Sequence, residues 1–214
     1  MPAHDDSPIA SLLMRNEEWA AGIDRMNPQT FLRMATERQQ PKVLWIGCAD
    51  SRVPESVVTA SVPGDIFVHR NIANQFSPDD PNGASVVQFA VQSTRVTDVV
   101  VVGHTRCGGV QAALGVANGD APPDGPLGQW LRDLVDLANE LPPAPPPAAE
   151  TILMDANVAR AVSRVRDFIS NLKPIQDGSP HRVKIVGMVY ELETGRLRRI
   201  GDHLAAECMA ESMP

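Results

Sequence analysis

The sequence predicts an α/β fold: a mainly parallel central sheet with flanking helices, an N-terminal helical arm and an antiparallel edge strand. Apolar runs of strand length occur at residues 43–47, 66–69, 99–103 and 183–190. Helical patterns lie between the later runs, and strands that alternate with helices build parallel sheets through right-handed crossovers. Cysteine or histidine directly follows two of the runs, and parallel sheets bind ligands at the carboxyl ends of their strands.

Length and composition indicate one domain of ordinary globular character. The chain has 214 residues, of which 43% are hydrophobic and 21% charged, and its formal net charge is −7. We expect a single domain over residues 1–214, made of a helical arm (1–40), an α/β core (41–202) and a tail (203–214). The negative charge and the lack of a basic stripe argue against a nucleic-acid partner.

The amino terminus and the cysteine content favour a cytoplasmic protein. The first residues are acidic and lack the apolar segment of a secretory signal. The apolar runs are too short to span a bilayer, so no membrane association is expected. Three cysteines do not make a disulfide framework, and they suit a reducing compartment.

Two helices are expected in the arm. A Ser-Pro pair at residues 7–8 supplies an N-cap and a proline at the first helical position, and the helix should run to about Met26. An Asn-Pro pair at residues 27–28 opens a second helix, which should end at Pro41. Charged residues are frequent in this arm. The pattern is compatible with packing on a partner subunit and equally with packing on the protein's own core.

Apolar periodicity places the first helices of the core. One is expected over residues 84–94, with an apolar face formed by Val86, Val87, Ala90 and Val91. A second is expected over residues 108–118, and a third around Trp130 that stops at Pro142.

The last third of the core combines a loop, a long helix and a turn. Residues 142–149 are proline-rich and are expected to form a stiff surface loop. A helix follows over residues 155–171, with an apolar face formed by Val158, Ala161, Val162, Val165 and Ile169. A tight turn at residues 193–196 would fold residues 197–200 back as the edge strand. The tail is expected to be loosely held.

The candidate metal ligands are Cys48, His104 and Cys107. Cys48 ends one apolar run, whereas His104 and Cys107 follow another, three residues apart. Two cysteines and one histidine occur in catalytic zinc sites that keep a fourth position open. Alternatively, the cysteines are ordinary buried thiols beside a core histidine, or Cys48 and Cys107 form a disulfide, which a reducing compartment disfavours. Cys208 lies in the tail without the polar companions that accompany the other two cysteines, and we expect no functional role for it.

Asp50 and Arg52 lie beside the first ligand and are spaced to meet if the loop curls. A guanidinium can hold a carboxylate in one orientation through two parallel hydrogen bonds. We expect this pair to close the loop as an ion pair, and an arginine that holds Asp50 away from a metal would also keep the fourth position open.

These residues resemble the β-class carbonic anhydrases, over about residues 44–202. Three motifs carry the resemblance: Cys-x-Asp-x-Arg at residues 48–52, Pro-Gly-Asp-x-Phe-Val-x-Arg-Asn at 63–71, and Gly-His-x-x-Cys-Gly-Gly at 103–109. Trp130-Leu131, Asn157-Val158 and the turn region at residues 190–197 match as well.

The resemblance implies a zinc enzyme that interconverts carbon dioxide and bicarbonate. Its zinc ligands would be Cys48, His104 and Cys107, with Asp50 and Arg52 as the catalytic dyad. An obligate homodimer, often paired again into a tetramer, would form through helical arms and an extended sheet.

Two further sets of residues follow from the resemblance. A branch of the family holds an inhibitory bicarbonate at a second site, and the matching residues here are Trp45, Arg70 and Tyr190. An apolar pocket suits carbon dioxide, and its candidate walls, some of which the partner chain would supply, are Val62, Phe67, Phe89 and Gly108.

Three other functions remain open at this point. A hydrolase of carbonyl sulfide or carbon disulfide would use the same zinc site. A metal- or bicarbonate-binding protein without catalysis would have no use for the Asp50–Arg52 pair. A nucleotide-binding domain would use Gly108-Gly109 at a helix start, although no G-x-G-x-x-G or Walker pattern is present.

Overall fold

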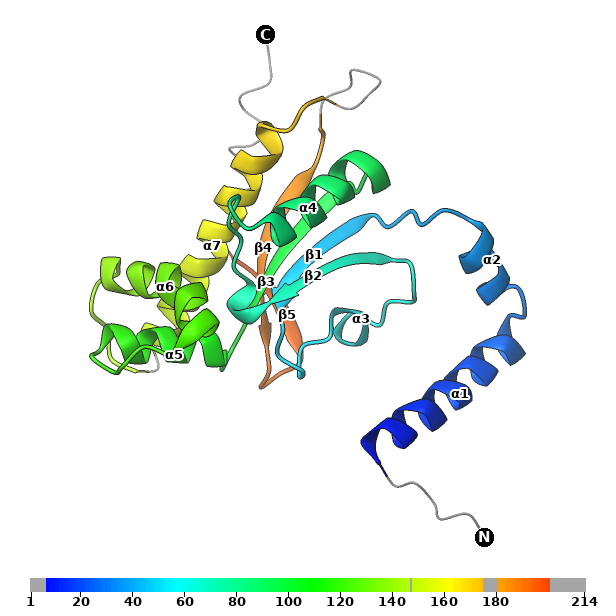
Figure 1. Ribbon diagram of the computed structural model, residues 1–214, viewed down its shortest axis with the longest axis horizontal. Helices are drawn as coiled ribbons and strands as arrows, with labels where there is room; N and C mark the ends of the chain where they lie inside the picture. The colour runs from blue at the N-terminus through cyan, green and yellow to red at the C-terminus, as the bar shows by residue number, and fades with distance from the viewer. Residues whose placement is uncertain (1–6, 147, 175–180, 201–214) are drawn as a thin grey trace. The chain divides into compact units, whose positions relative to one another are not determined.

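The computed structural model describes residues 7–146, 148–174 and 181–200. The chain forms two compact units, Met1–Gln39 and Gln40–Pro214. Figure 1 labels the helices and strands. The expected tail and Cys208 lie outside the described residues.

The first unit consists of helices α1 (Pro8–Met26) and α2 (Thr30–Thr36). Ser7 caps α1 as predicted, because its Oγ accepts a hydrogen bond from the Ala10 amide at 3.1 Å. The prediction that the second helix ends at Pro41 was wrong. Residues 37–40 are polar, so they offer no apolar side chain whose burial would stabilise another helical turn.

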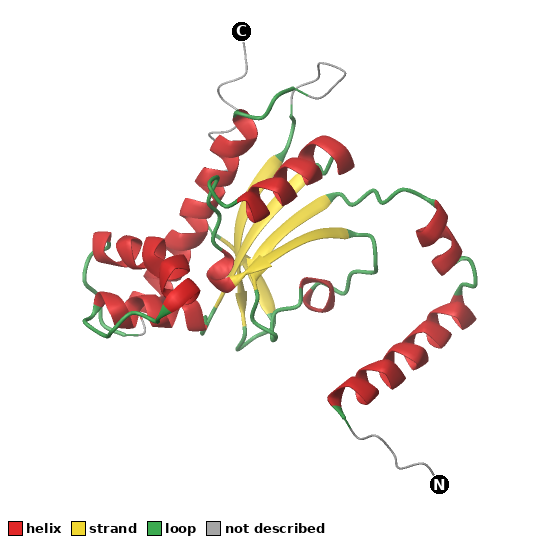
Figure 2. Cartoon of the chain, in the orientation of Figure 1, coloured by secondary structure: helices red, strands yellow, loops and turns green. Residues whose placement is uncertain are grey.

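The second unit contains one sheet in the order β2-β1-β3-β4-β5 (yellow in Figure 2). Four strands are parallel: β1 (Val43–Cys48), β2 (Ile66–Asn71), β3 (Asp98–His104) and β4 (Lys184–Glu191). The fifth strand, β5 (Arg196–Arg199), pairs antiparallel with β4 at one edge. The predicted mainly parallel sheet and its antiparallel edge strand are thus confirmed.

The strand order contains a switch in chain direction between β1 and β3. From β1 the chain goes to β2 on one side, whereas from β3 it goes to β4 on the other side. Such a switch in direction separates the loops that follow two adjacent strands, and ligands bind in the resulting gap. Cys48 and His104 are the last residues of these two strands.

Helices α4 (Pro81–Phe89), with its π-helical extension η2 (Ala90–Thr94), and α7 (Ala148–Ser170) pack on one face of the sheet (Figure 1). The predicted helix over residues 84–94 begins three residues earlier, because the Asp80 carboxylate accepts hydrogen bonds from the amides of Asn82 and Gly83. The predicted apolar face is confirmed, with Val87, Ala90 and Val91 buried and Val86 half-buried.

Helix α7 also begins earlier than the predicted residue 155. Its first two turns carry Leu153 and Met154, which are buried against α5 (Gly108–Ala117) and α6 (Gly125–Glu140). The apolar face of α7 therefore extends further toward the N-terminus than the apolar periodicity of residues 155–171 indicated. All five apolar residues predicted for the second half are buried.

The opposite face of the sheet is less well covered in the described chain. Its buried residues are Trp45, Val100 and Val102, and half-buried apolar side chains surround them. The short helix α3 (Glu55–Val58), which the sequence analysis missed, contributes Val58 to this cluster. Among the described residues, no helix is long and apolar enough to cross a membrane.

Candidate metal centre

The three predicted ligands lie together at the carboxyl edge of the sheet. Cys48 ends β1, His104 ends β3, and Cys107 is the N-cap of α5. One ligand atom from each residue lies within 4.8 Å of the other two, and all three residues are buried. The set therefore has the donors and the proximity that a metal ion requires.

The hydrogen bond of His104 fixes which ring nitrogen faces the cysteines. Nδ1 donates to the backbone carbonyl of Thr105 at 2.9 Å, which leaves Nε2 as the nitrogen with a free lone pair. Nε2 is buried and has no hydrogen-bond partner. Because a buried acceptor without a partner costs free energy, this nitrogen fits a metal ligand.

The two sulfur atoms also favour a bound cation. They lie 3.9 Å apart, far beyond disulfide bonding distance, and both thiols are free. Hydrogen bonding from the Cys107 thiol lowers the pKa of Cys48, whereas the Cys48 sulfur raises the pKa of Cys107. Two adjacent buried thiolates repel each other, so both ionise readily only when a metal ion balances their charge.

Arg52 holds Asp50 beside the ligands. Its guanidinium donates from Nε to Oδ1 at 3.0 Å and from Nη2 to Oδ2 at 2.7 Å. These bonds hold the pKa of the Asp50 carboxyl well below its usual range, so the side chain is an acceptor of hydrogen bonds. Oδ2 lies 3.9 Å from Nε2 of His104. The carboxylate therefore borders the ligand cluster while both its oxygens stay bonded to Arg52.

Arg70, one of the three candidate bicarbonate residues, contacts the backbone of residues 48–52, here called the metal loop. Its guanidinium donates to the carbonyl oxygens of Cys48 and Asp50, and Nη1 lies 3.9 Å from Oε2 of Glu55. Trp45 and Tyr190 belong to the same apolar cluster on the less covered face of the sheet. The indole nitrogen of Trp45 is buried and has no hydrogen-bond partner.

Two of the four candidate pocket residues are in contact with each other. Phe67 and Phe89 stack on each other with ring centroids 5.8 Å apart. Asn71 on β2 lies beside Cys48 in the strand register. Phe67 comes four residues before Asn71 on the same strand, so about 13 Å of strand separates Phe67 from the level of Cys48. Val62 is 62% exposed. Gly108 directly follows a ligand and has open space beside its Cα.

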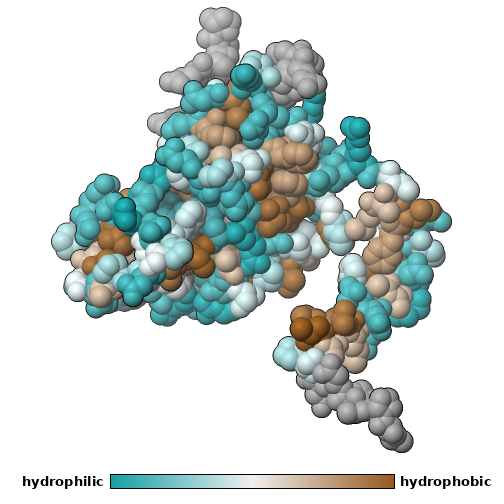
Figure 3. Space-filling view, in the orientation of Figure 1, coloured by the Kyte–Doolittle hydropathy of each residue, from teal (hydrophilic) through white to brown (hydrophobic). Residues whose placement is uncertain are grey.

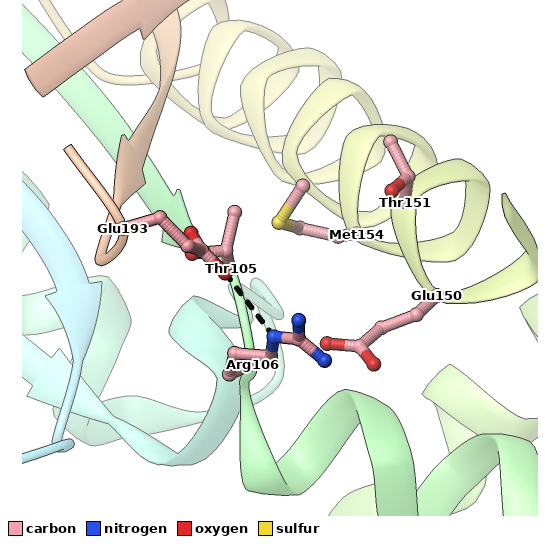
Figure 4. A pocket seen from close by; sticks show the side chains of 6 residues that line it. All are labelled: Thr105, Arg106, Glu150, Thr151, Met154 and Glu193. Atoms are coloured by element: carbon pink, nitrogen blue, oxygen red, sulfur yellow. Dashed lines mark hydrogen bonds and ion pairs between the residues drawn. The ribbon is translucent and has the colours of Figure 1, made fainter. Parts of the chain in front are cut away.

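A contact between the loop that joins β3 to α5 and the β4–β5 turn was missed by the sequence analysis. Glu193 accepts hydrogen bonds from the Thr105 hydroxyl at 2.7 Å and from the Arg106 guanidinium at 3.1 Å (Figure 4). The carbonyl of Arg106 in turn accepts a hydrogen bond from Arg52 at 3.2 Å. The sequence marked residues 193–196 only as a turn, and no local pattern reveals a partner that lies about 90 residues away.

Comparisons with known proteins agree with this geometry. A family model described as carbonic anhydrase matches residues 43–197. A carbonic anhydrase of Emericella nidulans is 42% identical over 123 residues, which are 57% of this chain and 51% of that protein. The chain thus spans about half the length of that relative. A carbonic anhydrase of Candida albicans is 30% identical over 202 residues, which are 91% of this chain and 69% of that protein.

A solved structure shows the same fold. It is one of two tetrameric β-carbonic anhydrases from Sordaria macrospora, 30% identical in sequence, and it superposes with a TM-score of 0.76. The match covers 90% of this chain and 96% of that chain. The family model covers more than half of the sequence and includes all three clustered ligands, and the chain belongs to the β-carbonic anhydrase family.

Proposed function

We propose that the protein catalyses the reversible hydration of carbon dioxide to bicarbonate and a proton, with a zinc ion held by Cys48, His104 and Cys107. One observation carries the proposal: three buried soft ligands converge, and a carboxylate held by an arginine lies next to them. A protein that only stores metal has no need for such a carboxylate.

The bound zinc would act as a Lewis acid and lower the pKa of the reacting water. Asp50 would accept a hydrogen bond from the attacking water and thereby direct an oxygen lone pair at the carbon atom of the substrate. Arg52 would keep this carboxylate ionised and correctly oriented. The His104 hydrogen bond to Thr105 would keep the lone pair of Nε2 directed at the ligand cluster.

The decisive experiment is stopped-flow hydration of carbon dioxide by zinc-quantified protein, by the chelator-stripped apoprotein and by the zinc-restored protein. We expect activity that is lost with the metal and regained with it. The same preparations assayed with carbonyl sulfide and carbon disulfide test the hydrolase alternative. Zinc-loaded protein that is inactive on all three substrates would instead support a binding function.

Gly109, one of the glycine pair at residues 108–109, has a packing explanation, which weakens the nucleotide-binding alternative. A Cβ atom on Gly109 would lie 2.9 Å from the Cβ of Ala73 and 3.0 Å from Cγ2 of Ile72. Glycine is therefore favoured at residue 109 because the side chains of Ala73 and Ile72 approach closely.

The proposed partner is a second copy of the chain, with arm (1–40) and core (41–202) acting as one functional domain in each subunit. The arm exposes large apolar side chains (Figure 3), namely Ile9, Leu12, Leu13, Met14, Trp19, Met26, Leu32 and Met34. Apolar surface of this kind typically marks an interface. In addition, β2 is an edge strand, and its unpaired backbone groups are available to extend the sheet. The tetrameric relative supports a further pairing of dimers.

We also propose that bicarbonate inhibits the enzyme at Trp45, Arg70 and Tyr190. The unpartnered indole nitrogen of Trp45 supports this site, because a buried donor needs an acceptor such as an anion. The two free thiols at the metal centre fit the reducing cytoplasm, which we propose as the location of the protein.

A further inference from the structure

Two consecutive backbone carbonyl groups contact the two halves of the candidate metal centre. The carbonyl of Thr105 accepts a hydrogen bond from Nδ1 of His104 at 2.9 Å. The carbonyl of Arg106 accepts one from Nη2 of Arg52 at 3.2 Å, and the same nitrogen donates to Asp50 at 2.7 Å. The first carbonyl therefore directs the imidazole of a proposed ligand, and the second orients the guanidinium that holds the carboxylate.

The loop that joins β3 to α5 carries both carbonyls and has an unusual backbone. Arg106 has φ 57°, in the left-handed region that residues with a Cβ rarely adopt. Such a conformation persists where the surrounding structure fixes it. The positions of the two carbonyls therefore depend on contacts that this loop makes with another part of the chain.

The β4–β5 turn supplies these contacts. The backbone amide of Thr105 donates to the carbonyl of Tyr190 at 3.1 Å, and the amide of Leu192 donates to the Thr105 hydroxyl at 2.9 Å. The hydroxyl in turn donates to Oε2 of Glu193 at 2.7 Å. Oε1 of Glu193 accepts from Nε of Arg106 at 3.1 Å (Figure 4). One carboxylate thus binds the side chains of both residues whose carbonyls face the metal centre.

The contact with Glu193 is too exposed to contribute much to folding. The side chains of Arg106 and Glu193 are 61% and 50% exposed. Ion pairs with this exposure stabilise a protein little, because water already solvates both charges. Removal of the carboxylate should therefore leave the fold intact and affect mainly the position of the loop.

We propose that Thr105 and Glu193 are positioning residues of the metal centre, which hold the two carbonyls that orient His104 and Arg52. The inference rests on the proposed roles of His104 as a metal ligand and of Arg52 in the catalytic dyad. Thr105 and Glu193 act through the main chain of the loop. The β4–β5 turn, about 90 residues away in the sequence, thereby becomes part of the support of the site.

The test compares variants of the zinc-loaded protein. Glu193→Ala removes both acceptor oxygens, and Thr105→Val removes the hydroxyl while keeping the shape of the side chain. Without these contacts the loop moves, and its carbonyls no longer align with His104 and Arg52. We expect zinc to pass to a chelator about tenfold faster and kcat for hydration to fall about tenfold, with little change in KM.

A spectroscopic measurement follows the loop directly and needs no substrate. In protein with nitrogen-15-labelled histidine, the Nδ1–H group of His104 gives its own NMR signal. The hydrogen bond to the Thr105 carbonyl protects this proton from exchange with water. We expect faster exchange in both variants, whereas the unfolding temperature of Glu193→Ala should stay close to that of the native protein.

Thr105→Ser and Thr194→Val are the controls. Thr105→Ser keeps the hydroxyl, so it should retain the native proton exchange, zinc release and kcat. Thr194 lies on the same turn, and its hydroxyl donates to Glu191 at 2.9 Å. Thr194→Val is thus the same substitution as Thr105→Val at a hydroxyl that bonds within the turn, and it should leave all three measurements unchanged.

Native proton exchange, zinc release and kcat in Glu193→Ala would overturn the proposal, and so would equal effects in Thr194→Val. If Thr105→Val does not fold, Glu193→Ala decides alone. Faster zinc release and proton exchange in a protein that hydrates no carbon dioxide would support the positioning role and refute only the proposed function. A native protein that binds no zinc would overturn both proposals.

Discussion

Arg70 donates a hydrogen bond from Nε to the carbonyl oxygen of Cys48 at 2.8 Å, across the boundary between β2 and β1. A second nitrogen of the same guanidinium binds the carbonyl of Asp50. The edge strand β2 therefore holds the backbone that carries both a proposed metal ligand, Cys48, and the proposed catalytic carboxylate, Asp50. We expect loss of the Arg70 side chain to loosen this loop, whatever else Arg70 binds.

The bicarbonate site is consequently better tested at Tyr190 than at Arg70. Tyr190→Phe removes one hydroxyl group and leaves the Arg70 hydrogen bonds intact, so the uninhibited enzyme should keep its zinc. We expect weaker inhibition in rate measurements with increasing bicarbonate at fixed pH and ionic strength. Arg70→Ala should weaken inhibition and also reduce the uninhibited rate, because it loosens the loop. Inhibition unchanged in both variants would show that the site lies elsewhere.

Metal content should depend on Cys107. Cys107→Ala removes one of three ligands, and we expect the native protein to hold about one zinc ion per chain and the variant to lose most of it. Elemental analysis of purified protein measures this directly. Zinc undiminished in the variant would mean that the ion is bound at another position.

The Asp50–Arg52 pair should affect rate far more than metal binding. Asp50→Asn and Arg52→Ala leave all three ligands in place, so both variants should retain zinc. Because each disturbs the orientation of the group next to the reacting water, hydration should slow by about 100-fold or more. Near-normal stopped-flow rates in the zinc-loaded variants would show that the pair is only an ion pair that closes the loop.

The hydration rate should be low near neutral pH and rise in alkali. Two thiolates in the ligand set cancel the formal charge of the zinc ion, so it acidifies water less than it would with three histidines. We expect kcat/KM for carbon dioxide to climb toward about pH 8.5–9, a unit or two above the pKa of a three-histidine site. A profile that is flat from neutral to alkaline pH at constant ionic strength would contradict the argument.

Stability in acid should depend on Asp133, which links α6 to α7. Hydrogen bonding to Arg164, together with the charge of Arg160, lowers the pKa of the Asp133 carboxyl. Because the pKa is lower in the folded state, the ionised carboxylate stabilises the protein at pH values above its unfolded-state pKa, near 4. This stabilisation is lost as the pH falls from that value through the folded-state pKa. Urea unfolding should therefore show native protein more stable than Asp133→Asn at pH 7, with the difference shrinking toward pH 3. A pH-independent difference would exclude this linkage.

The sequence by itself determined the local features of this protein. Apolar runs marked the strands, a serine marked the start of α1, and the cysteines, histidine and Asp-x-Arg spacing marked the candidate metal site. Each of these is a property of residues near one another in the chain. The resemblance to β-carbonic anhydrases followed from the same short motifs.

Only the tertiary structure decided how distant segments meet. It set the strand order that brings Cys48 next to His104, and it showed that Arg70 binds the metal loop and that Trp130 reaches the carbonyl of Ile72. A left-handed alanine at residue 73 has no signature in the sequence, because the hydrogen bonds that hold it come from helices far along the chain. The physical reason is that every buried backbone group needs a hydrogen-bond partner, and the packing of helices on the sheet determines which side chain comes close enough to be that partner.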